Sequence, residues 1–178
     1  MIIVRKSVKG LSQSALSRYL TATRNAVGLR AEVNVLLTNS AELQALNYRF
    51  RRKNLPTDVL SFPAMPTTDE LAGDVAISVE IAKENSRQLG HTTADEVKIL
   101  ILHGVLHLAG YDHERDRGQM ARREQALRQE LGLPVGLIQR SIATSKQPKS
   151  DRKRLTTPQD PKVRNKVPAS GNQKRETR

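Results

Sequence analysis

The sequence predicts an α+β fold (mixed α/β): a single small domain in which one sheet of about four strands is packed by about five helices. Two observations support this fold class. Short apolar runs of strand length alternate along the chain with longer segments of helical periodicity. The 178 residues can bury one substantial core but are too few for two full domains. We therefore expect one ordered domain at residues 1–142.

The predicted elements follow the order β-α-β-α-β-β-α-α-α. Among the strands, the alternation of Val33, Val35 and Leu37 is typical of a half-buried strand. The four strands are expected at residues 1–7, 31–38, 59–62 and 75–77. The five helices are expected at residues 12–27, from 39 or 40 to before Pro56, from 78 to about 89, from 93 to about 109 and from 116 to about 131.

Capping residues set the predicted helix ends. Asn39 with Glu42, and Thr93 with Glu96, have the spacing of a capping box, in which the side chain of each residue accepts the backbone N–H of the other. Asp116 is predicted as the N-cap of the last helix. Further end signals are the N-cap Ser78 and the glycines that follow helices, Gly28, Gly90, Gly110 and Gly132.

The helix that begins near residue 93 is apolar on nearly every side. A helix of this composition must lie at the centre of the domain. It also carries His103 and His107, so we expect it to be a rigid, buried support for whatever these two side chains bind.

Three of the four histidines lie within eleven residues and predict a metal site. His103 and His107 are four residues apart, a separation of about 400° and about 6 Å along a helix, so they emerge on one face. Gly110 can end the helix in the left-handed conformation and let the chain return with His113. Three imidazole nitrogens leave a fourth tetrahedral position open, as in catalytic zinc sites. A single buried histidine is more often a hydrogen-bonded core residue, and the isolated His91 is assigned no role.

Zinc peptidases are the natural alternative, because the metzincins share the spacing of these histidines. Peptidases of this kind place a glutamate directly after the first histidine, where it acts as the general base. Here that position is Gly104, which cannot accept a proton. The general base or the group that stabilises charge must therefore come from elsewhere in the chain.

The composition of the chain restricts its class. The absence of cysteine excludes disulfides and thiolate zinc ligands. No apolar run approaches the roughly 20 residues of a membrane span, so we expect a cytoplasmic protein that does not enter a membrane. We also expect that the protein needs no small-molecule cofactor.

The C-terminal segment, residues 143–178, is predicted to be a disordered basic tail. It holds eleven Lys and Arg against three Asp and Glu, a net charge of +8 out of the chain's +12. It has no aromatic residues and few aliphatic ones, so it cannot bury enough surface to offset the entropy of ordering. Such a tail attracts polyanions through phosphate contacts, or serves only to keep the protein soluble.

A second polar segment, residues 47–63, lies between a predicted helix and strand, where loops often carry functional groups. It contains four clustered cations, Arg49, Arg51, Arg52 and Lys53. Guanidinium groups bind phosphate oxygens in bidentate fashion, and an arginine beside a metal suits phosphoryl transfer. Without the metal site, the same cluster would indicate only a solvated surface.

These motifs together resemble the YbeY family of bacterial rRNA-maturation endoribonucleases. The resemblance rests on residues 47–63, on Gly73-Asp74-Val-Ala-Ile-Ser78 and on the uninterrupted histidine motif at 103–113. It covers most of residues 31–135. It implies a zinc-dependent endoribonuclease that prefers single strands and acts in 16S rRNA 3′-end maturation and ribosome quality control. The implied partners are the 16S rRNA precursor and the small ribosomal subunit.

The resemblance also implies residue roles. His103, His107 and His113 match the family's three metal ligands, Arg51 matches its active-site arginine, and Gly104 is normal for the family. The nucleophile stays open between a water and the RNA 2′-hydroxyl. Asp112 and Glu114 are candidates for a base or for a partner of an imidazole N–H, with Asp58 and Asp74 as weaker candidates. A ribosome-assembly factor with a structural zinc remains an alternative.

Overall fold

The computed structural model describes residues 1–65 and 70–134. The predicted fold class and element order are confirmed within these residues. The strands are β1 (Ile2–Val4), β2 (Glu32–Thr38), β3 (Val59–Pro63) and β4 (Leu71–Ser78). The helices are α1 (Gln13–Val27), α2 (Ser40–Arg51), α3 (Val79–Leu89), α4 (Thr93–Leu108) and α5 (Gln119–Glu130). The predicted domain boundary at residue 142 and the basic tail at 143–178 lie outside the described residues.

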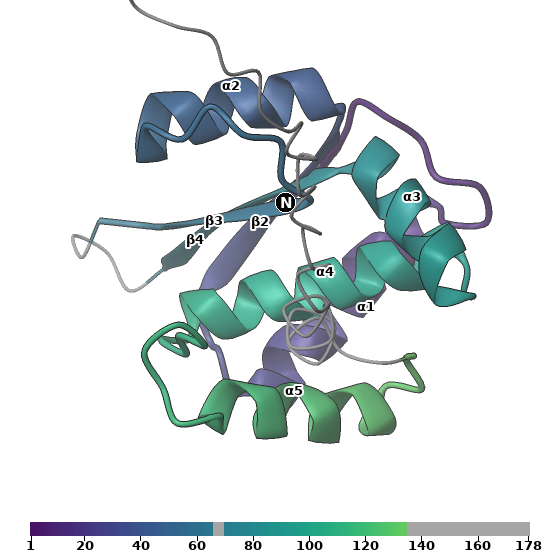
Figure 1. The fold of residues 1–178 in the computed structure, drawn as a ribbon. Helices are drawn as coiled ribbons and strands as arrows, with labels where there is room; N and C mark the ends of the chain where they lie inside the picture. Colours follow the sequence, from purple (N-terminus) through teal and green to yellow (C-terminus); the bar gives the residue numbers. More distant parts are fainter. Residues whose placement is uncertain (66–69, 135–178) are drawn as a thin grey trace, which may run out of the picture. The chain divides into compact units, whose positions relative to one another are not determined.

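The four strands form one sheet in the order β1-β2-β4-β3. The pairs β1–β2 and β2–β4 are parallel, and β3 is antiparallel to β4 at the edge of the sheet. In Figure 1, α2 covers one face of the sheet, α1 and α4 lie on the opposite face, and α5 lies beyond α4. Within the described residues, no helix is both long and apolar enough to cross a membrane.

Helix α4 lies at the centre, as its apolar sequence predicts. Val97, Leu100 and Val105 pack on the buried face of the sheet, while Ile99 and Leu106 pack with α5. A smaller cluster on the other face of the sheet joins α2 to β3 and β4 through Leu43, Leu60 and Ala76. Burying a side chain of this size stabilises the fold by roughly 1.5–3 kcal/mol, so α4 is held firmly from two sides.

The beginning of α4 differs from the prediction by one residue. The N-cap is Thr92, whose Oγ1 accepts the backbone N–H of Asp95 at 3.0 Å, so the predicted capping box of Thr93 with Glu96 is wrong. Glu96 is fully buried, and its Oε2 lies 2.7 Å from Nε2 of His91. The side chain of Glu96 therefore binds a ring in the preceding loop, and His91 has a structural contact that the sequence does not predict.

The beginning of α5 also differs from the prediction. Its N-cap is Gly118 in the left-handed conformation (φ 81°), and no side chain caps it at that position. Asp116, the predicted N-cap, accepts the backbone N–H groups of Gly118 at 2.7 Å and Met120 at 2.6 Å. The carboxylate thus satisfies first-turn N–H groups as a cap does, but the extra turn at Gly118 delays the helix to Gln119. Strand β4 is longer than predicted and begins at Leu71.

Candidate metal centre

Three imidazole rings converge at the C-terminal end of α4. His103 and His107 leave the same face of the helix one turn apart, with ring centroids separated by 4.8 Å. Gly110, at φ 91°, turns the chain out of the helix, as the sequence predicts. The ring of His113 then lies 5.3 Å from that of His103 and 5.2 Å from that of His107, centroid to centroid. One nitrogen of each ring lies within 4.8 Å of the other two.

The orientation of two rings is fixed through their Nδ1 atoms. Nδ1 of His103 lies 3.0 Å from Oε2 of Glu124 in α5, and Nδ1 of His107 lies 2.9 Å from the backbone carbonyl of Tyr111. A carbonyl and a carboxylate only accept, so each Nδ1 carries the proton that it donates. The two Nε2 atoms face each other at 3.1 Å. In two neutral rings these atoms present lone pairs to the same point in space.

Burial keeps His107 in the neutral form that a metal requires. Removal from water, together with the neighbouring His103 and His113, lowers the pKa of His107 to about 4 from its ordinary value of 6.5. At neutral pH its Nε2 therefore carries a lone pair and no proton. The cluster of three nitrogens, without sulfur, is a donor set that fits a divalent ion with imidazole ligands and one further open position.

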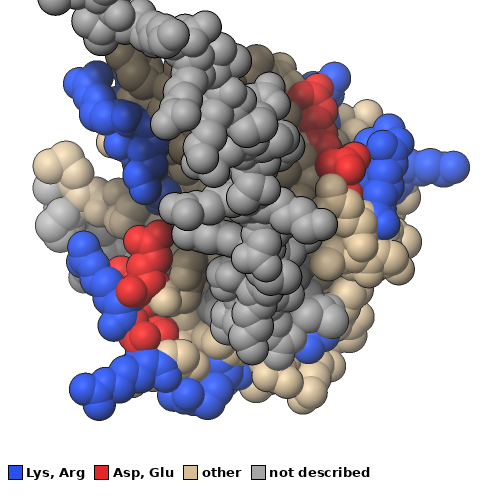
Figure 2. Space-filling view, in the orientation of Figure 1, with Lys and Arg blue, Asp and Glu red and all other residues tan. Residues whose placement is uncertain are grey.

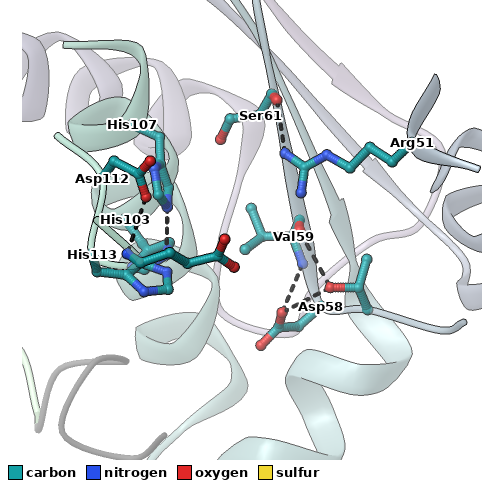
Figure 3. A pocket seen from close by; sticks show the side chains of 10 residues that line it. Arg51, Asp58, Val59, Ser61, His103, His107, Asp112 and His113 are labelled. Atoms are coloured by element: carbon teal, nitrogen blue, oxygen red, sulfur yellow. Dashed lines mark hydrogen bonds between the residues drawn. The ribbon is translucent and has the colours of Figure 1, made fainter. Parts of the chain in front are cut away.

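A pocket of about 420 Å³ opens over these rings. Figure 3 shows the rings gathered on one side, with the guanidinium of Arg51 reaching in from the other side. Arg51 ends α2, and its Nη2 donates to the carbonyl of Ser61 on the edge strand β3 at 3.3 Å. The structure therefore brings together the four site residues predicted from the sequence, His103, His107, His113 and Arg51.

The two acidic candidates that flank His113 are not the partners of the Nδ1 atoms of His103 and His107. Asp112 and Glu114 both line the pocket. Oδ1 of Asp112 accepts the backbone N–H of Glu114 at 3.0 Å, which shapes the loop. The partners on the Nδ1 atoms of His103 and His107 are Glu124 and the Tyr111 carbonyl instead. Asp112 and Glu114 thus remain near the open side of the site, where a base would need to lie.

The two weaker acidic candidates separate in space. Asp58 lines the pocket, and it also accepts the N–H of Val59 at 2.9 Å and an amide N–H of Asn85 at 3.2 Å. This is the turn chemistry that the sequence suggests. Asp74 lies inside β4 and not at a strand end, and its Oδ1 accepts from the side-chain amide of Asn34 at 2.9 Å. Asp74 is not among the residues that line the pocket.

Gly104 faces the sheet and not the pocket. A Cβ at this position would lie 2.7 Å from Cγ1 of Val75, 2.9 Å from its Cγ2 and 3.1 Å from Oγ of Ser61. The backbone of α4 therefore approaches β3 and β4 closely only because residue 104 has no side chain. The glutamate that a zinc peptidase carries after its first histidine has no room here, because even a Cβ would meet Val75 and Ser61. The structure therefore also argues against a peptidase.

Glu124 is a functional candidate that the sequence did not single out. This carboxylate is 1% exposed and lies 21 residues beyond His103. A signal for it exists in the sequence, because Met120, Glu124 and Leu127 share one buried stripe of α5. A carboxylate within an apolar stripe requires a partner. The sequence could show that need, but not that the partner is His103.

Basic side chains form two groups near the site. Figure 2 shows Lys and Arg gathered at the C-terminal end of α2 and again around the loop that follows α4, with Asp and Glu between them. The cations at the end of α2 are Arg49, Arg51, Arg52 and Lys53, all of them exposed. A phosphate that approaches the three rings from the C-terminal end of α2 therefore meets positive charge first.

Known proteins resemble this chain in sequence and in fold. The family model described as "Endoribonuclease YbeY" matches residues 3–132. A relative named Endoribonuclease YbeY from Koribacter versatilis is 53% identical over 154 residues, which are 86% of this chain and all of that protein. One of the same name from Solibacter usitatus is 45% identical over 139 residues, covering 78% and 92% of the two chains. A Thermotoga maritima protein known from a solution structure superposes with a TM-score of 0.51 at 30% identity, covering 85% of this chain and 100% of its own.

Proposed function

The chain belongs to the YbeY family of endoribonucleases, and we propose that it is a zinc-dependent enzyme that cleaves single-stranded RNA in the cytoplasm. We propose 16S rRNA precursor as its substrate, with roles in 3′-end maturation and ribosome quality control on the small subunit. The observation that carries the zinc dependence is the convergence of two Nε2 atoms whose rings are anchored through Nδ1.

The proposed ligands are His103, His107 and His113, one nitrogen each. A bound zinc ion supplies positive charge that polarises a phosphodiester oxygen. Glu124 and the Tyr111 carbonyl hold two of the rings in the tautomer that leaves Nε2 free.

Arg51 is the proposed catalytic residue. Its guanidinium lies across the pocket from the three rings, so it can contact the non-bridging oxygens of the same phosphate. Charge on these oxygens grows as the phosphorus becomes pentacoordinate, and a fixed cation stabilises that state more than the ground state. Asp112 and Glu114 are the proposed candidates for the base.

The test combines cleavage in solution with RNA ends in cells. Arg51→Ala should lower the rate of cleavage of a single-stranded rRNA fragment by about 10²- to 10³-fold, the usual effect of losing one preorganised charge-stabilising group. Arg51→Lys should recover only part of it, because an ammonium lacks the bidentate geometry. Lys53→Ala is the matched control: this neighbouring cation is exposed and does not line the pocket, so its loss should weaken the attraction of RNA without lowering the cleavage rate at saturating RNA.

In cells that depend on the variant, Arg51→Ala should leave 16S 3′ ends immature. Mature ends in cells carrying a folded Arg51→Ala protein would instead favour the assembly factor with a structural zinc. A zinc peptidase would require metal-dependent products from a peptide library, and Gly104 leaves it without the usual base.

A further inference from the structure

We propose that a second groove, on the α2 side of the sheet, binds an unpaired nucleobase of the RNA strand whose phosphodiester lies over the three histidines. This inference rests on the proposed function and extends it, because it names the part of the substrate that is recognised and explains why the strand must be single.

The groove is larger and more apolar than the pocket over His103, His107 and His113, which we call the metal pocket. Its volume is about 710 Å³, within the usual range for small-molecule sites. It exists because α2 covers only part of its face of the sheet. Leu43 of α2 packs on Leu60 of the sheet, and both are buried. Farther along the same face of the sheet, Leu36 is half-buried and Ile3 is 41% exposed.

The groove and the metal pocket share two residues, Arg51 and Ser61. Arg51 donates to the Ser61 carbonyl across the edge of β3, so the two depressions meet at this strand. A polymer with a phosphate beside Arg51 therefore has its neighbouring nucleotide at the entrance of the groove. This continuity identifies the occupant as part of the same substrate strand.

The groove presents aromatic surface to that nucleotide. The chain has two phenylalanines, and both of them, Phe50 and Phe62, line the groove. Their rings meet edge to face, with centroids 5.1 Å apart and planes at 62°. Phe50 is 59% exposed, and the guanidinium carbon of Arg49 lies 5.4 Å from its ring centroid. Aromatic rings beside arginines are the common platform for unpaired bases.

The polar groups near the groove also suit a base. The side chains of Asn34 and Asp74 line it and are bonded to each other at 2.9 Å. Amide and carboxylate groups pair with the amino and ring nitrogens of bases, while the exposed cations at the end of α2 attract the backbone. In a duplex the bases are stacked and paired inside the helix and cannot enter the groove. Single-strand preference follows from this geometry.

The test is an abasic scan of a short single-stranded RNA against the full-length, zinc-loaded protein. RNA affinity is measured by fluorescence anisotropy, and cleavage of the same RNAs is followed in parallel. Removing one base next to the cleaved bond should weaken binding to the wild type on the order of tenfold, the size expected for one stacking contact. Phe50→Ala should bind the unmodified RNA about tenfold more weakly and show no additional loss of affinity at that abasic position.

Two variants control for indirect effects. Phe50→Trp keeps an aromatic face and should restore both the affinity and the sensitivity to the abasic position. Tyr48→Ala removes another exposed aromatic ring of α2 that does not line the groove, and it should behave as the wild type. Circular dichroism checks that each variant is folded.

An abasic penalty of equal size in wild type and Phe50→Ala would overturn the inference, and it is the result expected if the groove instead receives a protein. If the RNA is cleaved but the abasic penalty is equal in wild type and Phe50→Ala, the proposed function stands and the proposed role of the groove is rejected. RNA binding without cleavage would reject the proposed enzyme, yet the abasic comparison would still decide the groove. Absence of both binding and cleavage would reject both.

Discussion

The Nδ1 contacts of two histidines decide what their other nitrogens can do. His103 and His107 each donate from Nδ1, to Glu124 and to the Tyr111 carbonyl, so their Nε2 atoms are turned toward one point. An imidazole that was free to rotate would lose this direction. The site is therefore preorganised by partners outside the histidine motif.

Glu124→Gln tests this anchoring. Gln keeps the size of the side chain but replaces a charged acceptor with a weaker neutral one, so we expect zinc affinity to fall by about 10- to 100-fold. Competition with a chromophoric chelator measures the affinity directly. Glu114→Gln, which changes an exposed carboxylate in the same pocket, should leave it nearly unchanged. Equal affinities for wild type and Glu124→Gln would contradict the anchoring role.

The lowered pKa of His107 predicts a pH dependence of stability in the chelator-treated protein. The folded pKa is about 4 and the ordinary value is 6.5, so between these values the unfolded chain binds more protons. The free energy of unfolding should thus be unaffected by this group above pH 6.5 and should fall as the pH drops toward 4. Urea titrations at several pH values should show a smaller decrease for His107→Gln than for wild type. Identical pH profiles would refute the assignment.

Among individual residues, the sequence indicated the proposed metal ligands but not the groups that hold their rings in place. His103, His107, His113 and Arg51 carry motif spacing or a chemical type that indicates a metal and a phosphate. Glu124 has no such spacing, because its contact depends on how α5 is rotated against α4. That rotation is set by packing between helices and cannot be read from the residues of either helix alone.

Close packing of α4 on the sheet determines where the two helical histidines stand. On the helix, Gly104 allows the backbone of α4 to lie close to the sheet because it has no side chain. Gly73 allows it from β4, where a Cβ would lie 2.2 Å from the Phe62 carbonyl oxygen and 2.8 Å from Cδ2 of Leu108. Gly73 also has a φ of 147°, which other residues rarely adopt. Two glycines thus set the distance between α4 and strands β3 and β4.

Gly104→Ala should destabilise the protein even though alanine favours helices. The gain in helix propensity is roughly 1 kcal/mol, whereas forcing a methyl group against both methyls of Val75 costs about 1–3 kcal/mol. We expect a net loss of up to about 2 kcal/mol, measured by urea denaturation. In a Val75→Ala background the loss should shrink or change sign. A stabilised Gly104→Ala single variant would show that the packing is looser than described.

Element types and order were predictable because each strand and helix has the periodicity that its environment requires. The N-terminal ends of α4 and α5 could not be predicted in the same way. Thr92 and Thr93 are both good N-caps, and with Thr92 as the cap the buried Glu96 contacts His91 in the preceding loop. Asp116 has cap chemistry, but the left-handed Gly118 shifts the helix start. Local sequence rules name the candidates at such positions, and packing selects among them.

For the molecule as a whole, the described residues place the metal pocket and the apolar groove next to each other at the β3 edge. The cations at the end of α2 stand beside both. An RNA strand that crosses this edge would place a phosphate on one side and a base on the other, which assigns different recognition tasks to the two depressions.

The basic C-terminal segment provides a test of long-range electrostatics. Its +8 net charge predicts that removal of residues 143–178 weakens RNA binding and makes it less dependent on salt, while zinc-dependent cleavage continues. The slope of log affinity against log salt is measured for the full chain and for the truncated protein. The difference between the two slopes, divided by about 0.7 for a single strand, gives the number of phosphates that the segment neutralises. An unchanged slope would mean that the segment only aids solubility.

Zinc titration of the chelator-treated full chain, with cleavage of single-stranded RNA as the readout, tests whether the three histidines form a metal centre that the activity needs. We predict no cleavage without metal, recovery that saturates at one zinc ion per chain, and no recovery for His113→Ala at the same zinc concentrations. Full-rate cleavage by the metal-free protein, or an unchanged titration curve for His113→Ala, would contradict a metal centre built from the three histidines.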